Sequence, residues 1–119
     1  MTRVPEVTFK DRRPCHNGDY DWYNLTTSEI FDDKRVVVFA LPGAFTPTCS
    51  NFQLPGYDLS YHDFQALGID AIYCISVNDG FVTNAWAQDQ NIKNVKLIPD
   101  GNAYFTRSMG MLVNKSNLG

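Results

Sequence analysis

The chain has 119 residues, which is enough for one compact domain and too few for two. Hydrophobic residues make up 44% and charged residues 19%, a composition that excludes a disordered or fibrous protein. The net charge of −3 disfavours a nucleic-acid-binding surface, and we interpret the largest basic cluster, Arg12 and Arg13, as solvated hairpin residues. No apolar run approaches the ~20 residues that a membrane span requires, so no membrane partner is expected.

The termini and the cysteines bear on the cellular compartment. The segment "MTRVPEVTFK" lacks the apolar core of a secretory signal, and its single Arg3 is poor support for a transit peptide. The odd set of Cys15, Cys49 and Cys74 matches no zinc-binding spacing. We therefore expect reduced thiols in a reducing compartment, by default the cytoplasm, and no metal.

Residues 4–25, "VPEVTFKDRRPCHNGDYDWYNL", are predicted to form a β-hairpin. Asn17-Gly18 is a strong signal for a two-residue type I′ turn, because that turn requires positive φ at both positions. Cys15 and His16 would then lie near the turn, exposed and without a chemical role, since a reactive thiol needs an electropositive site.

The next segments predict a helix, a strand and a second helix. Thr26 and Glu29 have the spacing of a capping box, so a short helix begins there. The run "RVVVFA" at 35–40 is typical of a parallel strand that is buried on both faces. A helix is expected to start close to Thr48, and Pro55 should kink or interrupt it.

Residues 57–68, "YDLSYHDFQALG", are predicted to resume this helix. Leu59 and Leu67 count among its apolar positions, and Gly68 is placed as a C-terminal cap. His62 lies in a polar and aromatic stretch, and we interpret it as a surface histidine rather than a catalytic one.

The remaining chain continues the alternation of strands and helices. A strand at 69–77 precedes a helix at 81–90, and a strand at 95–99 precedes a short helix at 103–112. Alternating strands and helices predict a parallel sheet that is covered on both faces. The fold class is therefore α/β, with residues 1–119 as a single domain.

The loop "LPGAFTPTCS" at 41–50 presents the candidate reactive group, Cys49. It follows a strand and lies in the first turn of the next helix, where free N–H groups and the helix dipole favour thiolate over thiol. Thr46 can place a hydroxyl beside the sulfur, while Pro42 and Pro47 stiffen the loop and limit solvent access. A buried structural cysteine is equally compatible with this position.

The chemistry open to such a thiolate is narrowed by its sequence context. A cysteine hydrolase needs a paired histidine, and neither His16 nor His62 has a claim to that role. The chain has no C-x-x-C, so a thioredoxin-like disulfide exchanger lacks its second thiol. A one-thiol redox centre that forms a sulfenic acid at Cys49 fits best.

The segment "VVVFALPGAFTPTCS" resembles the active-site segment of peroxiredoxins. The resemblance is to the atypical type II branch, which includes the peroxidase part of peroxiredoxin–glutaredoxin hybrids. The family pattern P-x-x-x-T-x-x-C is met by Pro42, Thr46 and Cys49. The likeness extends to "TTSEIF", "CISVNDGFVTNAW" and "IPDGNAYFTRSMGM", so it covers nearly all of the chain.

The resemblance implies a thioredoxin-like fold and a thiol peroxidase without a cofactor. Cys49 would attack a hydroperoxide, Thr46 would hydrogen-bond the peroxide oxygen, and Pro42 would shield the sulfenate, with the Cys49 backbone N–H as a further donor. Glutaredoxin, glutathione or thioredoxin would act as the reductant. The resemblance also implies a homodimer through the loops around Phe45 and Phe81.

Cys74 corresponds to a second cysteine that several members of this branch carry. As a mid-strand residue we interpret it as a packing residue rather than a resolving thiol. A resolving thiol would have to reach the sulfenate, because the exchange requires direct attack of one sulfur on another.

The sequence departs from the family at its end. Family members continue through two more strands and a helix, and the first of those strands carries an active-site arginine, whereas this chain ends at Gly119. Arg107 is the nearest arginine but lies in the preceding helix. We expect an exposed edge at 35–40, lower stability and slower peroxide reduction. The alternative hypothesis is a truncated peroxiredoxin-like protein with impaired turnover that acts as an interaction or assembly partner; a general disulfide oxidoreductase is a weaker one.

Overall fold

The computed structural model describes residues 3–118, which begin with an antiparallel hairpin of β1 (Thr8–Pro14) and β2 (Tyr20–Thr26). The hairpin is as predicted, but the two-residue type I′ turn is wrong. The Gly18 N–H donates to the Cys15 carbonyl (3.1 Å), and the Cys15 N–H donates to the Asp19 carbonyl (2.6 Å). Within this turn only Gly18 has positive φ (87°), so the connection is a three-residue loop that needs one glycine.

The parallel sheet contains β3 (Val36–Leu41), β4 (Ala71–Ser76) and β5 (Lys96–Pro99), in that order. Before it lies α1 (Thr27–Phe31), which begins at the predicted cap: the Thr26 hydroxyl accepts a hydrogen bond from the Glu29 N–H at 3.3 Å. The alternation of strands and helices predicted for residues 35–112 is confirmed.

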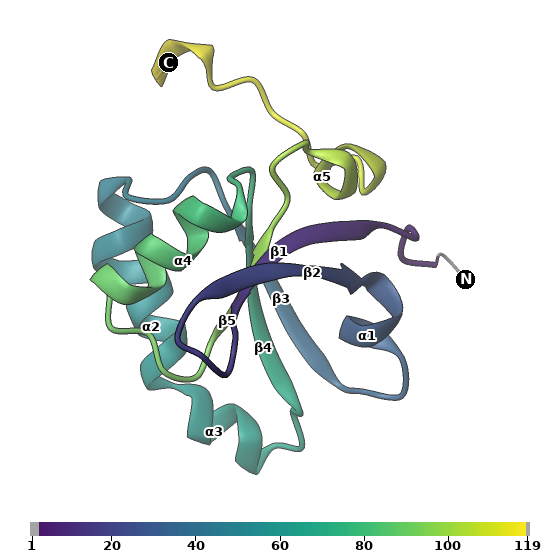
Figure 1. The fold of residues 1–119 in the computed structure, drawn as a ribbon, viewed down its shortest axis with the longest axis vertical. Helices are drawn as coiled ribbons and strands as arrows, with labels where there is room; N and C mark the ends of the chain where they lie inside the picture. Colours follow the sequence, from purple (N-terminus) through teal and green to yellow (C-terminus); the bar gives the residue numbers. More distant parts are fainter. Residues whose placement is uncertain (1–2, 119) are drawn as a thin grey trace.

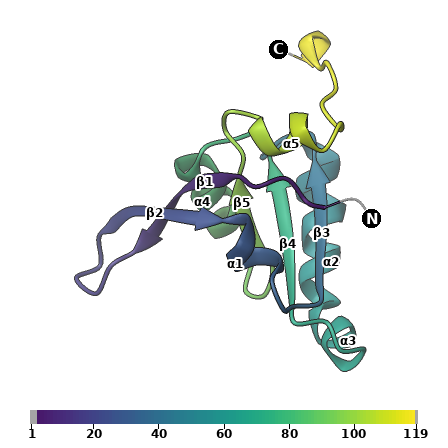
Figure 2. The same cartoon turned by 90° about the vertical axis from the view of Figure 1, so that its right-hand side faces the viewer.

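Helices form the connections between successive strands of the parallel sheet (Figures 1 and 2). The connection from β3 to β4 contains the π-helical segment η1 (Cys49–Gln53), α2 (Leu54–Leu59) and α3 (Tyr61–Ala66). The connection from β4 to β5 contains α4 (Gly80–Asp89). After β5 come α5 (Tyr104–Ser108), an extended segment that runs away from the sheet, and the short 3₁₀ helix η2 (Ser116–Leu118).

Two hydrophobic clusters cover the two faces of the sheet, as predicted. Toward the hairpin, α1 and α5, the buried cluster consists of Phe9, Leu25, Ile30, Ala71, Tyr73, Ile75, Ile98 and Phe105. Toward the helices of the two crossovers, it consists of Leu41, Cys49, Leu54, Ile72, Cys74, Trp86 and Val95. The alternate residues of β4 enter opposite clusters because successive side chains of a strand point to opposite faces.

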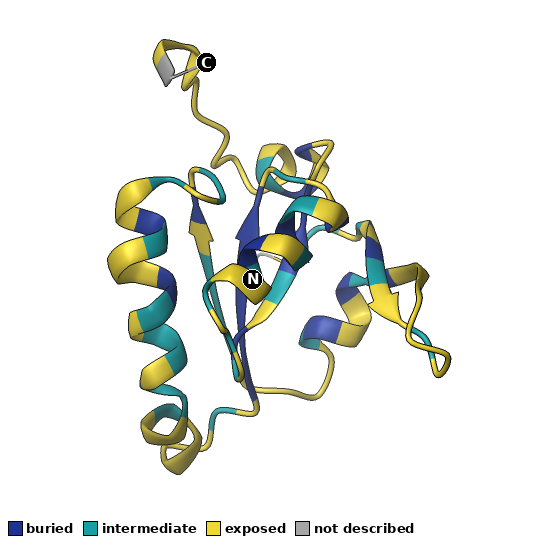
Figure 3. Ribbon diagram, turned by 60° about the vertical axis from the view of Figure 1, so that its left-hand side comes forward, coloured by how far each residue is buried: buried dark blue, intermediate teal, exposed yellow. Residues whose placement is uncertain are grey.

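β3 is not buried on both faces, although its composition alone predicts this, and it forms the exposed edge that is expected at 35–40. All six residues of β4 are buried, whereas Val36 to Phe39 of β3 are half-buried and Ala40 is exposed. Figure 3 shows the burial concentrated in the central part of the sheet. The reason is topological, because β3 lies at an edge of the described sheet and β4 has a neighbouring strand on each side.

The segment 57–68 is not one resumed helix. The break at Ser60 (φ −86°, ψ 2°) separates α2 from α3, so the phase of the apolar pattern restarts there. As a result, Leu59 and Leu67 are 84% and 75% exposed rather than packed. Gly68 ends the segment with φ of 88°, as predicted for a helix cap, and His62 is exposed.

The contrast within α2 gives a test of the packing. Leu54→Ala should lower the free energy of unfolding by about 2–5 kcal/mol, because Leu54 is 0% exposed and its truncation leaves a cavity. The matched variant Leu59→Ala removes the same atoms from an exposed position and should change it by no more than about 0.5 kcal/mol. Urea unfolding would measure both, and equal losses would show that the assigned faces of α2 are wrong.

Candidate active site

The helix that carries Cys49 begins at residue 47, close to the predicted position. Its first turns are wide: the Leu54 N–H donates to the Cys49 carbonyl, five residues back, in a π-helical turn. Pro55 follows directly, and its ring and missing N–H are incompatible with a regular α-helical turn before it. The predicted interruption at Pro55 thus takes the form of a π-helical segment rather than a break.

Cys49 lies in the first turn of this helix, with 3% of its surface exposed. The Ser50 N–H donates to the Thr46 carbonyl at 2.9 Å, whereas the Cys49 N–H has no acceptor among the described residues. The first N–H groups of a helix lack intrahelical partners and form its positive end. The backbone therefore offers a free donor and a favourable dipole at the residue that carries the sulfur.

The Thr46 hydroxyl is fixed by the loop itself. It donates to the Gly43 carbonyl at 2.7 Å, which closes the turn before the helix. A hydroxyl that donates one hydrogen bond keeps two acceptor lone pairs. Thr46 can therefore accept a hydrogen bond from the O–H of a bound hydroperoxide while it holds the loop.

The loop between β3 and the helix is tied to the next strand. The Ala44 N–H donates to Asn78 Oδ1 at 3.0 Å, and Asn78 follows the carboxyl end of β4. The adjacent Phe45 is 53% exposed and has φ of 62°, a conformation that costs of order 1–3 kcal/mol for a residue other than glycine. The bond to Asn78 contributes to holding the loop in this strained form.

The buried indole of Trp86 is hydrogen-bonded to the helix that carries Cys49. Trp86 is fully buried on α4, and its Nε1–H donates to the Ser50 hydroxyl at 2.9 Å. The sequence predicted a helix at 81–90, which contains Trp86, but did not reveal this hydrogen bond or the role of Asn78. Two signals were available: a buried indole N–H needs an acceptor, and polar residues at the carboxyl ends of adjacent parallel strands meet.

Pro42 is exposed and lines an apolar cavity of about 440 Å³ at the carboxyl end of β3 and β4. Its floor includes Ser76, whose buried hydroxyl has no hydrogen-bond partner among the described residues. Cys49 is not among the lining residues, so this cavity lies beside the thiol loop rather than over the sulfur.

The other two cysteines have different surroundings. Cys74 is fully buried in the same hydrophobic cluster as Cys49; burial, with a smaller effect of the Cys49 charge, raises its pKa to about 12. Cys74 is therefore a protonated thiol at neutral pH, as expected of a packing residue. Cys15 is half-buried at the hairpin turn.

Within residues 3–118, no group of three or more His, Cys, Asp or Glu side chains is arranged to hold a metal ion. None of the helices in this part of the chain combines the length and the apolar character needed to cross a membrane.

Comparison with known proteins assigns the chain to a class. The Redoxin family profile matches residues 3–118. A peroxiredoxin of Rhizobium etli is 55% identical over 121 residues, which cover 98% of this chain and 68% of that protein. A hybrid peroxiredoxin of Haemophilus influenzae is 53% identical over 98% of this chain and 46% of its own length. The chain thus spans about two thirds of the first relative and less than half of the second.

The structure supports the same class. The crystal structure of reduced Prx3 from Vibrio vulnificus in complex with hydrogen peroxide matches with a TM-score of 0.88 at 36% identity, over 99% of this chain and 72% of that one. The chain has a thioredoxin-like α/β fold with an N-terminal hairpin. It belongs to the peroxiredoxin family, in the type II branch that includes the hybrid peroxiredoxins.

The raised pKa of Cys74 predicts a pH effect on stability. The folded state holds this proton from the ordinary value of 9.0 up to about 12, while the unfolded state loses it. The contribution of this proton to the free energy of unfolding is therefore fully present below pH 9. It decreases as the pH rises toward 12, by about 1.4 kcal/mol per pH unit. Cys74→Ala should lack this contribution, so urea unfolding from pH 8 to 11 should show a shallower decline for the variant than for the wild type. Parallel declines would contradict the assignment.

Proposed function

We propose that the protein is a thiol-dependent peroxidase that reduces hydrogen peroxide and small organic hydroperoxides through a sulfenic acid at Cys49. The observation that carries the proposal is the position of Cys49: a sheltered thiol at a helix start, with an unpaired N–H and a loop closed by Thr46. Membership of the peroxiredoxin family supports the same reaction class.

The proposed reaction begins with attack of the Cys49 thiolate on the terminal oxygen of the hydroperoxide. An S–O bond forms as the O–O bond breaks, and the terminal oxygen keeps its proton to give Cys–SOH. The alkoxide or hydroxide that leaves takes one proton from solvent and becomes an alcohol or water. In this proposal the Cys49 N–H donates to the charge that develops in the transition state, Thr46 orients the peroxide, and Pro42 limits access of water to the sulfenate. Preorganised donors of this kind lower the barrier without reorganisation.

Small hydroperoxides fit this site better than bulky ones because only 3% of Cys49 is exposed. The sulfenic acid is then reduced by two thiols, which release water and leave a disulfide of the reductant. We assign this step to an external thiol, glutaredoxin, glutathione or thioredoxin, because the neighbouring Cys74 is protonated and buried.

The proposed compartment and assembly follow from the sequence and the surface. A reducing compartment, by default the cytoplasm, suits a mechanism that depends on free thiols. Phe45 and Phe81 are 53% and 56% exposed in the single chain. Large apolar side chains exposed in this way are typical of a protein interface, so we propose them as the centre of a homodimer contact.

One observation favours a second candidate function, an interaction or assembly partner with impaired turnover. β3 is an edge strand of the described sheet, and an unpaired edge is a template for a strand from another chain. Steady-state peroxide consumption with an added dithiol separates the candidates. Turnover supports the peroxidase, and a folded, oxidisable protein that does not turn over supports the partner. A general disulfide oxidoreductase is the weakest candidate, because the chain has no C-x-x-C.

Cys49→Ser should abolish peroxide consumption, while Cys15→Ser should leave it within about twofold of the wild type. Only Cys49 combines a helix start with a shaped loop. Dimedone trapping with peptide mapping, after one equivalent of hydrogen peroxide, identifies the oxidised residue. An adduct mainly on Cys15 or Cys74 would refute the assignment.

Thr46→Val should slow oxidation of Cys49 by about 10²–10³-fold, which corresponds to a few kcal/mol for one lost transition-state hydrogen bond. Because the hydroxyl also closes the loop onto Gly43, Thr46→Ser is the matched control. It keeps the hydroxyl and should retain most of the rate. If both variants fold and oxidise at the wild-type rate, Thr46 has no role in the reaction.

A further inference from the structure

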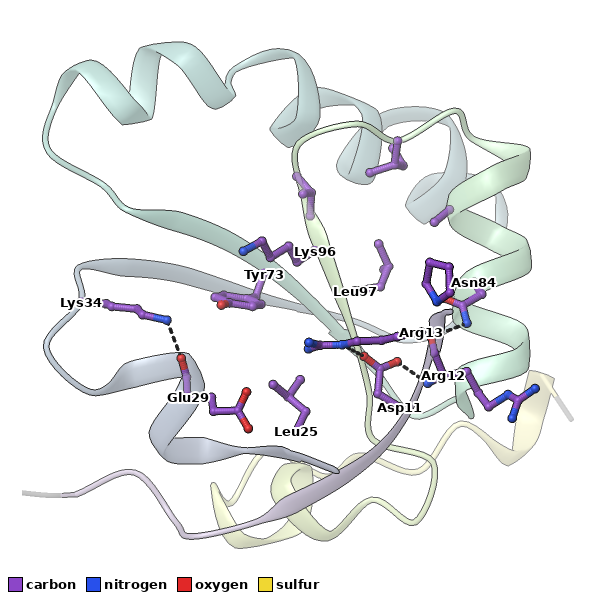
Figure 4. Close-up of a pocket in the computed structure, with 14 residues that line it drawn as sticks. Asp11, Arg12, Arg13, Leu25, Glu29, Lys34, Tyr73, Asn84, Lys96 and Leu97 are labelled. Carbon is purple, nitrogen blue, oxygen red and sulfur yellow. Dashed lines mark hydrogen bonds and ion pairs between the residues drawn. The ribbon is translucent and has the colours of Figure 1, made fainter. Parts of the chain in front are cut away.

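A second cavity, of about 470 Å³, lies beside the edge strand β5 (Figure 4). Its walls come from the end of β1, from β2, from α1 and the segment after it, from α4, and from the edge strand β5. Cys49, Thr46 and Pro42 do not line it, so it is separate from the proposed peroxidase site.

Four cationic residues line this cavity, but the Arg12 guanidinium lies over the Trp22 and Phe81 rings, 4.9 Å from each ring centre. The other three come from three separate elements. Arg13 comes from β1, Lys34 from the segment after α1, and Lys96 from β5. Figure 4 shows their charged ends gathered around the ring of Tyr73, which forms part of the cavity floor. This concentration contrasts with the net charge of −3 for the whole chain.

Two carboxylates line the same cavity, and both already have partners. Asp11 forms the only ion pair among the described residues, with Arg13 at 3.3 Å, and accepts the Arg12 N–H at 2.8 Å. Glu29 accepts a hydrogen bond from the Tyr23 hydroxyl at 2.6 Å. That bond, with smaller effects of the Arg13 and Lys34 charges, lowers the pKa of Glu29.

The two lysines lack such partners. Lys34 Nζ donates to the backbone carbonyl of Glu29 at 2.7 Å, and Lys96 Nζ lies 5.8 Å from the centre of the Tyr73 ring. Neither forms an ion pair within residues 3–118. Both ammonium groups therefore keep donors available for a negatively charged ligand, since each carries three.

Tyr73 adds a neutral donor at the floor. Tyr73 as a residue is 6% exposed, and its hydroxyl makes no hydrogen bond with another described residue. Burial raises the pKa of Tyr73, so the phenol is protonated at neutral pH and can donate. A phenol O–H flanked by three cations is a donor set for an anion with several oxygen atoms.

We propose that this cavity binds a phosphate group, as carried by a small phosphorylated metabolite. A phosphate presents several acceptor oxygens and a charge near −2, which matches donors that converge from three elements. The apolar walls from Leu25, Ile92 and Leu97 would contact the organic part of the molecule. The site goes beyond the proposed peroxidase activity and does not require it.

Isothermal titration calorimetry with inorganic phosphate, at ionic strength kept constant with chloride, tests the proposal on the full chain. We expect saturable binding at one site per chain. Lys34→Gln and Lys96→Gln should each weaken it by at least about fivefold, or about 1 kcal/mol. The control Lys93→Gln removes the same charge from an exposed position outside the cavity and should change it by less than about twofold.

Two further arms make the result decisive. Tyr73→Phe keeps the ring and removes the donor, so it should weaken phosphate binding while the far-ultraviolet circular dichroism stays unchanged. Succinate, a dianion of carboxylates, should bind more weakly than phosphate. The proposal is overturned by an absence of saturable binding, by equal losses in the Lys93 and Lys96 variants, or by succinate binding as tightly as phosphate.

Discussion

Burial of β4 on both faces is the constraint on which the rest of the structure depends. Ile72 and Cys74 pack against the crossover helices, and Ala71, Tyr73 and Ile75 pack against the hairpin side. Because neither face can shift without opening a core, the carboxyl end of β4 holds a fixed position. Asn78 extends from that end and binds the Ala44 N–H, which transmits the position of the strand to the loop that carries Cys49.

The two faces of the same strand contribute to the two proposed sites. Its Cys74 face belongs to the cluster that contains Cys49, and its Tyr73 face forms the floor of the cationic cavity. Electrostatics differ accordingly. At Cys49 the favourable charge comes from backbone dipoles at a helix start, whereas at Tyr73 it comes from Arg13, Lys34 and Lys96 side chains. A substitution at either site should therefore leave the other largely intact.

The sequence predicted what local patterns encode. The position of Cys49 in the first turn of a helix, the capped start of α1 and the strand–helix alternation all depend on residues close in the chain, and each is confirmed. The errors arise where distant contacts decide. Leu59 is exposed because the helix breaks at Ser60. The composition of β3 predicts burial on both faces, whereas its edge position follows only from the comparison with the family. The Trp86–Ser50 bond and the cationic cavity join segments far apart in sequence, so no local pattern could reveal them.

We propose that the fold, rather than cysteine chemistry alone, makes Cys49 reactive toward peroxide. Trp86 is a buried fluorescent side chain whose indole N–H is hydrogen-bonded to Ser50, the residue that follows Cys49. Stopped-flow mixing of the reduced protein with hydrogen peroxide should give a fluorescence change whose rate rises linearly with peroxide and exceeds that of free cysteine at least about a hundredfold. That factor corresponds to about 2.7 kcal/mol of transition-state stabilisation. The change should be absent in Cys49→Ser, and a rate equal to that of free cysteine would contradict the account.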